Sequence, residues 1–268
     1  MSRLNEAFSQ ASEKPVFIPF ITAGDPNEET TVELALALQE VGARVLELGI
    51  PYSDPLADGP VIQKASLRAL EGGMTLKKAL ALVPTMREKG VKIPIICFTY
   101  YNLLLQLGED QFIQEAAQKD LDGVLVPDLP FEESASLREK CQQAGLSLIS
   151  LVAPTTSEER LQRIGEAADG FLYCVSSLGV TGVRQAFHND VFHFLERVRK
   201  STDAPVAVGF GISSKEQVEQ FKDYCDGFIV GSAIVREVEA RVTQLSHEAD
   251  RSKAIEEIKE TLTTKFFN

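Results

Sequence analysis

The chain has 268 residues, of which 44% are hydrophobic and 25% are charged, as is typical of a soluble globular protein with a large core. Its formal net charge of −12 at pH 7 disfavours binding to nucleic acid or to an anionic membrane surface. The sequence shows no signal peptide and no apolar stretch that could span a membrane, so we expect a cytoplasmic protein.

Eight short β-rich runs follow one another along the chain. Most are continuously apolar, a pattern typical of parallel strands that are covered on both faces. The runs are residues 16–22, 44–50, 93–99, 123–127, 146–152, 170–175, 205–210 and 227–231.

Helical patterns separate these runs, with apolar residues at i, i+4 and i+7. Their expected boundaries are N-caps at Thr75 and Ser157, a first helical residue at Pro60, and terminating glycines at Gly42, Gly90 and Gly145. Two helices are additional to a simple alternation. One covers residues 4–11, and the other covers residues 75–90, where Pro84 is expected to bend or interrupt it.

Eight strands that alternate with helices predict a (β/α)₈ barrel, the TIM barrel, as a single domain over residues 1–268. The extra helices lie at its N-terminus and in its second βα unit. A doubly wound open sheet is the alternative. The number of strands and the lack of a GxGxxG motif after the first strand favour the barrel.

Glu47 lies near the end of the second predicted strand, where barrels carry their active residues. Strand alternation places Val45, Glu47 and Gly49 on one face, and Leu46 and Leu48 on the other. If the leucines pack on the helices, Glu47 faces the barrel interior and its pKa should rise. It is either a structural carboxyl group bonded to a neighbour or a catalytic acid–base group.

Asp58 follows eleven residues later, in the proline-rich stretch "GIPYSDPLADGP". An aspartate before a helix is more often an N-cap than a catalytic group. Asp54, which precedes Pro55, is likewise typical of a turn. The pattern alone therefore leaves both interpretations of Asp58 open.

Glycine-bearing segments follow the last three predicted strands: "GVTG" (179–182), "GFGIS" (209–213) and "GSAIV" (231–235). Glycine lets the backbone approach a ligand closely, and the helix that begins at Ser232 offers free N–H groups. These loops are the usual phosphate site of such barrels, although they could be plain turns.

Two classes of aldolase are disfavoured by the sequence. No lysine lies at the C-terminal end of a predicted strand, which disfavours a Schiff base. The three histidines and four scattered cysteines have no metal-ligand spacing, so we expect no metal site. The residues alone indicate a barrel lyase or isomerase that acts on a phosphorylated small molecule.

Five stretches together make the chain similar to the α subunit of tryptophan synthase: "ELGIPYSDPLADGPVIQKA", "PFITAGDP", "YYNLLLQLG", "VPDLPFEES" and "GVTGVR". The resemblance implies a (β/α)₈ barrel that cleaves indole-3-glycerol phosphate to indole and glyceraldehyde 3-phosphate. The alternatives are a sugar-phosphate epimerase or isomerase, a stand-alone indole-producing lyase, and a catalytically weak barrel that activates a β subunit.

The same resemblance implies roles for individual residues. Glu47 would be the acid–base group, and Asp58 would stabilise charge at the indole nitrogen. Thr181 would lie on a closing loop and reach Asp58. The indole would contact Phe20, Phe98, Leu125, Tyr173, Phe210 and Ile229, and the phosphate would contact Gly182, Gly211, Gly231 and Ser232.

The resemblance also implies a partner. The family forms an α₂β₂ complex in which indole passes to a β subunit that carries pyridoxal phosphate, and the α chain itself has no cofactor. The residues expected to face this partner are Pro51, Asp54, Tyr100, Asn102 and Asp128.

Overall fold

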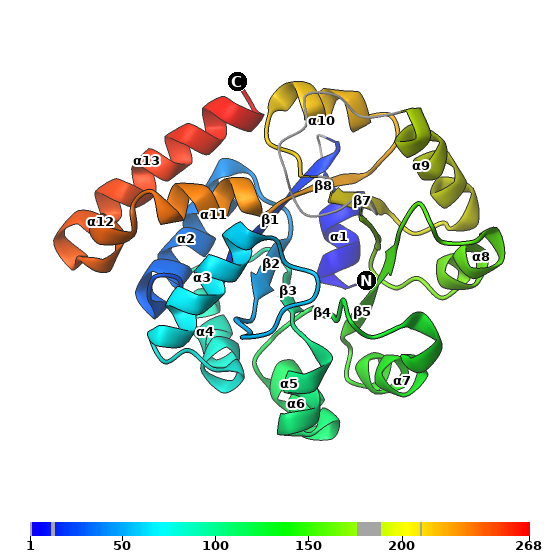
Figure 1. Ribbon diagram of the computed structural model, residues 1–268, viewed down its shortest axis with the longest axis horizontal. Helices are drawn as coiled ribbons and strands as arrows, with labels where there is room; N and C mark the ends of the chain where they lie inside the picture. The colour runs from blue at the N-terminus through cyan, green and yellow to red at the C-terminus, as the bar shows by residue number, and fades with distance from the viewer. Residues whose placement is uncertain (1, 12–13, 176–188, 210) are drawn as a thin grey trace.

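The computed structural model describes residues 2–11, 14–175, 189–209 and 211–268. Eight parallel strands form a closed barrel in which each strand pairs with its neighbours in the sequence and β8 pairs with β1. Figure 1 shows the strands at the centre and the helices around them. The strands are β1 (Val16–Thr22), β2 (Leu46–Gly49), β3 (Ile95–Phe98), β4 (Gly123–Leu125), β5 (Ser147–Val152), β6 (Leu172–Val175), β7 (Val206–Gly209) and β8 (Gly227–Val230).

Helices connect the strands and cover the outside of the barrel. In the part of the chain that the structure describes they are α1 (Arg3–Ser9), α2 (Glu28–Val41), α3 (Pro60–Glu71), α4 (Leu76–Glu88), α5 (Tyr101–Leu107), α6 (Glu109–Gln118), α7 (Ala135–Gln143), α8 (Glu158–Glu166), α9 (Asn189–Ser201), α10 (Lys215–Phe221), α11 (Ser232–Glu239), α12 (Val242–Ser246) and α13 (Glu248–Phe266), with a short 3₁₀ helix at Phe131–Glu133.

The predicted barrel is confirmed, and so are both additional helices, α1 and α4. Each predicted run contains one strand, although most strands are shorter than their runs. Of the two expected effects of Pro84, a bend or an interruption, the interruption was wrong, because α4 continues through this residue. Leu80, Val83 and Met86 of α4 are buried, and this packing holds the helix together despite the missing N–H.

The predicted helix boundaries are confirmed as well. The side chains of Thr75 and Ser157 accept hydrogen bonds from the backbone at the starts of α4 and α8. Gly42, Gly90 and Gly145 have φ angles of 113°, 108° and 75°, in the left-handed region that ends a helix without strain.

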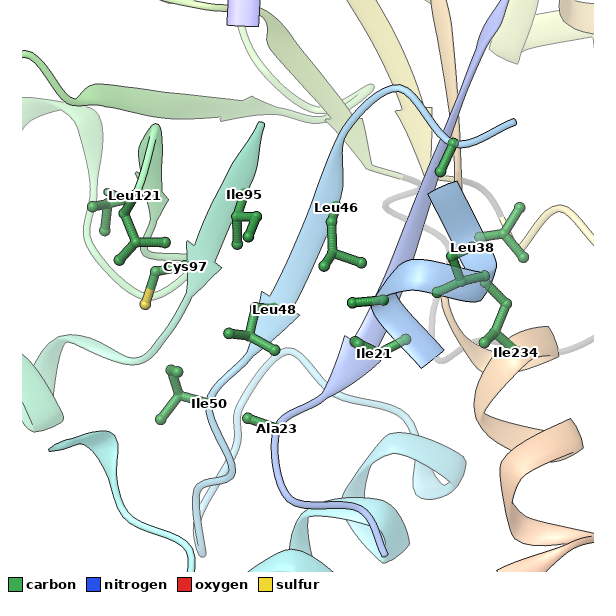
Figure 2. Close-up of a cluster of buried hydrophobic side chains, with 14 of the residues drawn as sticks. Ile21, Ala23, Leu38, Leu46, Leu48, Ile50, Ile95, Cys97, Leu121 and Ile234 are labelled. Carbon is green, nitrogen blue, oxygen red and sulfur yellow. The ribbon is translucent and has the colours of Figure 1, made fainter. Parts of the chain in front are cut away.

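Alternation along the strands separates two apolar layers. Val45 belongs to a cluster inside the barrel. Leu46, Leu48 and Ile50 belong to the layer between the barrel and the helices. Figure 2 shows these three side chains in the outer layer, which also contains residues of β1, β3, α2 and α11. Glu47, which lies between two outward leucines, therefore points into the barrel, as the alternation predicted.

Helix α1 covers the N-terminal end of the barrel. Its buried residues Leu4 and Phe8 belong to the interior cluster, and the ring of Phe8 lies 5.5 Å from that of Phe171. Arg3 of α1 forms ion pairs with Asp120 and Asp122, which precede β4, at 2.6 and 2.7 Å. The helix is thus held both by apolar packing and by charge.

We expect Phe8→Ala to lower the free energy of unfolding by about 3–5 kcal/mol, because Phe8 is 2% exposed and its loss leaves a cavity in the barrel. Chemical denaturation followed by circular dichroism measures this change. The control is Leu105→Ala, at a side chain that is 56% exposed, with an expected change below about 0.5 kcal/mol. A similar small change in both variants would mean that α1 is not part of the cooperative core.

Candidate active site

Glu47 is an isolated carboxyl group inside the barrel. It is 0% exposed, and neither of its carboxyl oxygens has a hydrogen-bond partner among the described residues. Its partners in the barrel register are Phe20 on β1 and Ile96 on β3, both apolar. Burial raises the pKa of Glu47 to about 8, because the charged form loses its hydration there. The group is therefore protonated at neutral pH.

Asp58 lies in the loop between β2 and α3 and is half-buried. The hydroxyl group of Tyr100 donates a hydrogen bond to its carboxylate. Burial raises the pKa of Asp58 to about 6, although the Tyr100 bond acts in the opposite direction. Asp58 is thus mostly ionised at pH 7. The N-cap of α3 is Gly59, with no side-chain cap, so the structure does not give Asp58 a capping role.

Tyr173 on β6 interacts electrostatically with both Glu47 and Asp58. Burial raises the pKa of its hydroxyl group well above the usual value, and the negative charges of Glu47 and Asp58 raise it further. All three groups therefore lie near one another, and Tyr173 stays neutral. Its ring needs the space beside Gly209, where a β-carbon would lie 2.7 Å from the ring.

Apolar side chains form the walls around these groups. The rings of Phe20 and Phe98 meet edge to face with their centroids 5.6 Å apart. Leu125 and Ile229 belong to the buried interior cluster. A β-carbon on Gly49 would lie 2.3 Å from the Phe20 ring, so a glycine at this position makes room for it. The surroundings of Glu47 are therefore apolar.

The loops after β7 and β8 supply backbone groups to the same end of the barrel. Gly211 has a φ angle of 71°, a left-handed conformation that favours glycine. Ser232 begins α11, and its buried hydroxyl oxygen has no hydrogen-bond partner among the described residues. We name Gly211, Gly231 and Ser232 the phosphate cradle, after the ligand that the sequence predicts there. The predicted contacts Thr181, Gly182 and Phe210 lie outside the described residues.

The five residues expected to face a partner divide into two groups. Asp54 and Asn102 are exposed, and Asp128 accepts a hydrogen bond from the backbone N–H of Tyr101 at 2.9 Å. Pro51 is buried and Tyr100 is only 1% exposed. The side chain of Tyr100 lies beneath the loop, and the five expected partner contacts stay predictions.

Tyr100 supports the loop that carries Asp58. Its hydroxyl oxygen accepts a hydrogen bond from the N–H of Ala57 at 3.1 Å while the hydroxyl group donates to Asp58. Its ring stacks on Tyr52 with the centroids 5.1 Å apart, and Asn102 donates to the Tyr52 hydroxyl group. This loop is thus fastened to the segment that follows β3.

A family model described as tryptophan synthase alpha chain matches residues 7–264. The chain belongs to this family. The tryptophan synthase alpha chain of Geobacillus kaustophilus (strain HTA426) is 59% identical over 91% of this chain and 90% of its own length. That of Shouchella clausii (strain KSM-K16) is 56% identical over 96% and 94%.

Solved tryptophan synthase structures have the same fold. The alpha subunit from Legionella pneumophila str. Paris has a TM-score of 0.84 at 34% identity, and the match covers 98% of both chains. A chain in a structure of the tryptophan synthase α₂β₂ complex from Pyrococcus furiosus has a TM-score of 0.82 at 36% identity over 93% and 96%.

Some site residues of this family member were not predicted from its sequence. The hydroxyl oxygens of Thr22 and Thr99 are buried at the ends of β1 and β3 and have no hydrogen-bond partner among the described residues. Arg68 forms an ion pair with the buried carboxylate of Asp25, close to the end of β1. A threonine at a strand end is a weak signal, and an acid in "GDP" is typical of a turn, so neither stood out.

Two structural findings bear on metals and membranes. Within the described ranges, no group of three or more histidine, cysteine, aspartate or glutamate residues is arranged to hold a metal ion. Over the same residues, no helix combines the length and the apolar character that crossing a membrane requires.

We expect Glu47→Gln to remove a pH-dependent loss of stability. The pKa of Glu47 is 4.5 in its ordinary state and about 8 in the folded protein. Between pH 4.5 and pH 8 the Glu47 carboxyl group is therefore ionised only in the unfolded chain. The folded state therefore loses stability as the pH rises from about 4.5 to about 8, by roughly 3 kcal/mol at pH 7.

Denaturant titrations of both proteins at pH 5 and pH 7 measure this difference. The parent should lose more stability than the variant between the two pH values, because glutamine does not ionise. The same pH dependence in both proteins would show that Glu47 is already charged in the folded state.

Proposed function

We propose that this chain cleaves indole-3-glycerol phosphate to indole and glyceraldehyde 3-phosphate by a retro-aldol reaction, as the α subunit of tryptophan synthase. The observation that carries the proposal is Glu47, a fully buried carboxyl group that lacks a partner among the described residues and has a pKa of about 8. A group with such a pKa can donate and accept a proton near neutral pH.

Glu47 would act twice in one turnover. The protonated carboxyl group gives its proton to C3 of the indole ring, which places positive charge on the ring nitrogen. The resulting carboxylate takes the proton of the 3′-hydroxyl group while the bond between C3 and C3′ breaks, and the electron pair of that bond returns to the ring. The products are indole and the aldehyde, and Glu47 is protonated again.

Asp58 would stabilise the charge that develops on the indole nitrogen. A carboxylate beside the ring N–H favours the protonated intermediate over the substrate. This role requires the ionised form, which a pKa of about 6 supplies at neutral pH. The Tyr100 hydrogen bond holds the carboxylate and also lowers its pKa.

The remaining groups would bind the two ends of the substrate. The indole ring would lie between apolar residues such as Phe20, Phe98 and Ile229. The phosphate would bind at the phosphate cradle, where α11 offers backbone N–H groups and the hydroxyl group of Ser232 lacks a partner among the described residues. This chemistry uses neither a Schiff base nor a metal ion, in agreement with the lack of lysine at the strand ends.

We also propose a β subunit as the partner. The solved relative from Pyrococcus furiosus is part of an α₂β₂ tryptophan synthase complex. In this chain the loop between β2 and α3 exposes Asp54 and Leu56, and Leu56 is 86% exposed. Leu56 is therefore the residue at which we test a protein contact on this loop. Pyridoxal phosphate would belong to the β subunit, and this chain would carry no cofactor.

We expect kcat/KM for indole release to depend on pH as a bell-shaped curve. It should fall below about pH 6, where Asp58 becomes protonated, and above about pH 8, where Glu47 loses its proton. Glu47→Gln should lower the rate by about 10²–10⁴, and Asp58→Asn by about 10²–10³.

A colorimetric indole assay over a pH series measures both effects, with Asp110→Asn as a control at an acid that is exposed on α6. Turnover of Glu47→Gln within a few-fold of the parent would disprove the proposed acid–base role. The absence of indole release by the parent itself would disprove the proposed function.

We expect Leu56→Ser to weaken binding to a β subunit by at least about tenfold, because a buried contact residue would be lost. Isothermal titration calorimetry with a β subunit measures the affinity. Leu67→Ser is the matched control, since Leu67 is a leucine on α3 that is 51% exposed. Equal affinities for both variants and the parent would place the partner surface elsewhere.

A further inference from the structure

Arg68, in the last turn of α3, lies where three elements that carry the site come together. We propose that Arg68 is a positioning residue, which holds Asp58 and the phosphate cradle at a fixed separation by tying α3 and α11 to the end of β1. This inference rests on the proposed lyase function and adds to it a residue that does not touch the substrate.

The contacts of Arg68 are those of a rigid clamp. Its Nε and Nη2 atoms donate to the two carboxylate oxygens of Asp25, at 2.8 and 2.9 Å. Its Nη1 atom lies 3.6 Å from the carboxylate of Glu239. The side chain of Asp25 is 3% exposed and that of Arg68 is 22% exposed. A paired fork of this kind fixes direction as well as distance.

Each partner of this clamp belongs to an element that ends or begins at the site. The backbone N–H of Asp25 bonds to the carbonyl oxygen of Thr22, the last residue of β1. Helix α3 starts two residues after Asp58, and α11 starts at Ser232 of the cradle and ends at Glu239. A rotation of α3 or α11 would therefore move one end of the substrate site relative to the other.

The two helices are also packed together nearer the site. They contact each other and β1, and Figure 1 shows them next to each other beside that strand. Phe20, Ala65 and Val235 form a small buried cluster between the three elements. Apolar packing thus joins α3 and α11 near the substrate, and the Arg68 clamp joins them at their far ends.

A purely stabilising role does not require this arrangement. Buried ion pairs add little net stability compared with apolar residues of similar volume, whereas a fork fixes an orientation. Arg87 provides the comparison within the same chain. It pairs with Asp122 at 2.7 Å and is 13% exposed, but it lies before β3, at the opposite end of the barrel from the site.

The proposed substrate would reach from Asp58 to the phosphate cradle, the two parts of the site that Arg68 holds at a fixed separation. Its ring nitrogen would meet Asp58 and its phosphate would meet the cradle. Inorganic phosphate would meet the cradle alone. Loss of the clamp should therefore affect the substrate, since a misplacement of about 1 Å can cost about 10² in rate, and leave phosphate binding nearly unchanged.

The experiment compares Arg68→Met, Arg68→Lys and the control Arg87→Met, at a temperature at which circular dichroism shows each variant to be folded. For Arg68→Met we expect kcat/KM for indole-3-glycerol phosphate to fall at least about tenfold while the inhibition constant of inorganic phosphate changes less than about twofold. Arg68→Lys keeps the charge but loses the fork, so its loss should be intermediate. Arg87→Met should keep the kinetic constants of the parent.

Two outcomes would overturn the inference: kinetic constants of Arg68→Met within twofold of the parent, or an equal loss in Arg87→Met. If the parent released no indole, the proposed function would fail separately. Amide hydrogen exchange then decides the positioning role on its own. Faster exchange of the hydrogen-bonded amides of α3 and α11 in Arg68→Met but not in Arg87→Met supports it, and unchanged exchange there contradicts it.

Discussion

The burial of a carboxyl group without a partner among the described residues is the constraint on which the site of this barrel depends. Glu47 keeps a pKa of about 8 only while its surroundings stay apolar and no cation approaches. This requirement accounts for the aromatic walls at Phe20 and Phe98 and for the glycines that make room beside them. It also accounts for the placement of a neutral phenol, Tyr173, close to both acids.

The pKa values of Glu47 and Asp58 differ because one residue lies on a strand and the other in a loop. Glu47 is carried by a strand, so the barrel register fixes it between apolar neighbours. Asp58 is carried by a loop, where burial raises its pKa to about 6 and the hydrogen bond from the Tyr100 hydroxyl group limits the rise. A pair of carboxyl groups with separated pKa values can hold one proton and one charge at the same pH. The fold therefore sets, before any substrate binds, the two protonation states that the proposed roles require.

Much of the fold could be predicted from the sequence, because strand period and glycine stops are local signals. The inward direction of Glu47 followed from the leucines on either side of it. The support of Asp58 by Tyr100 could not be predicted, since it depends on contacts across 42 residues of chain between the loop and the segment after β3. The Arg68–Asp25 pair, 43 residues apart, was missed for the same reason. Pro84 does not interrupt α4, because tertiary packing outweighs the local preference of proline.

Helix α1 closes one end of the barrel. Leu4 and Phe8 fill the end at which the strands begin, and Arg3 fastens the helix there. The proposed substrate would therefore enter and leave at the opposite end, where the loops that carry Asp58 and the cradle lie. Under the proposed function, release of the product and attachment of a β subunit would then compete for the same rim. A protein bound over that rim would control where an apolar product goes, without any change in the chemistry beneath it.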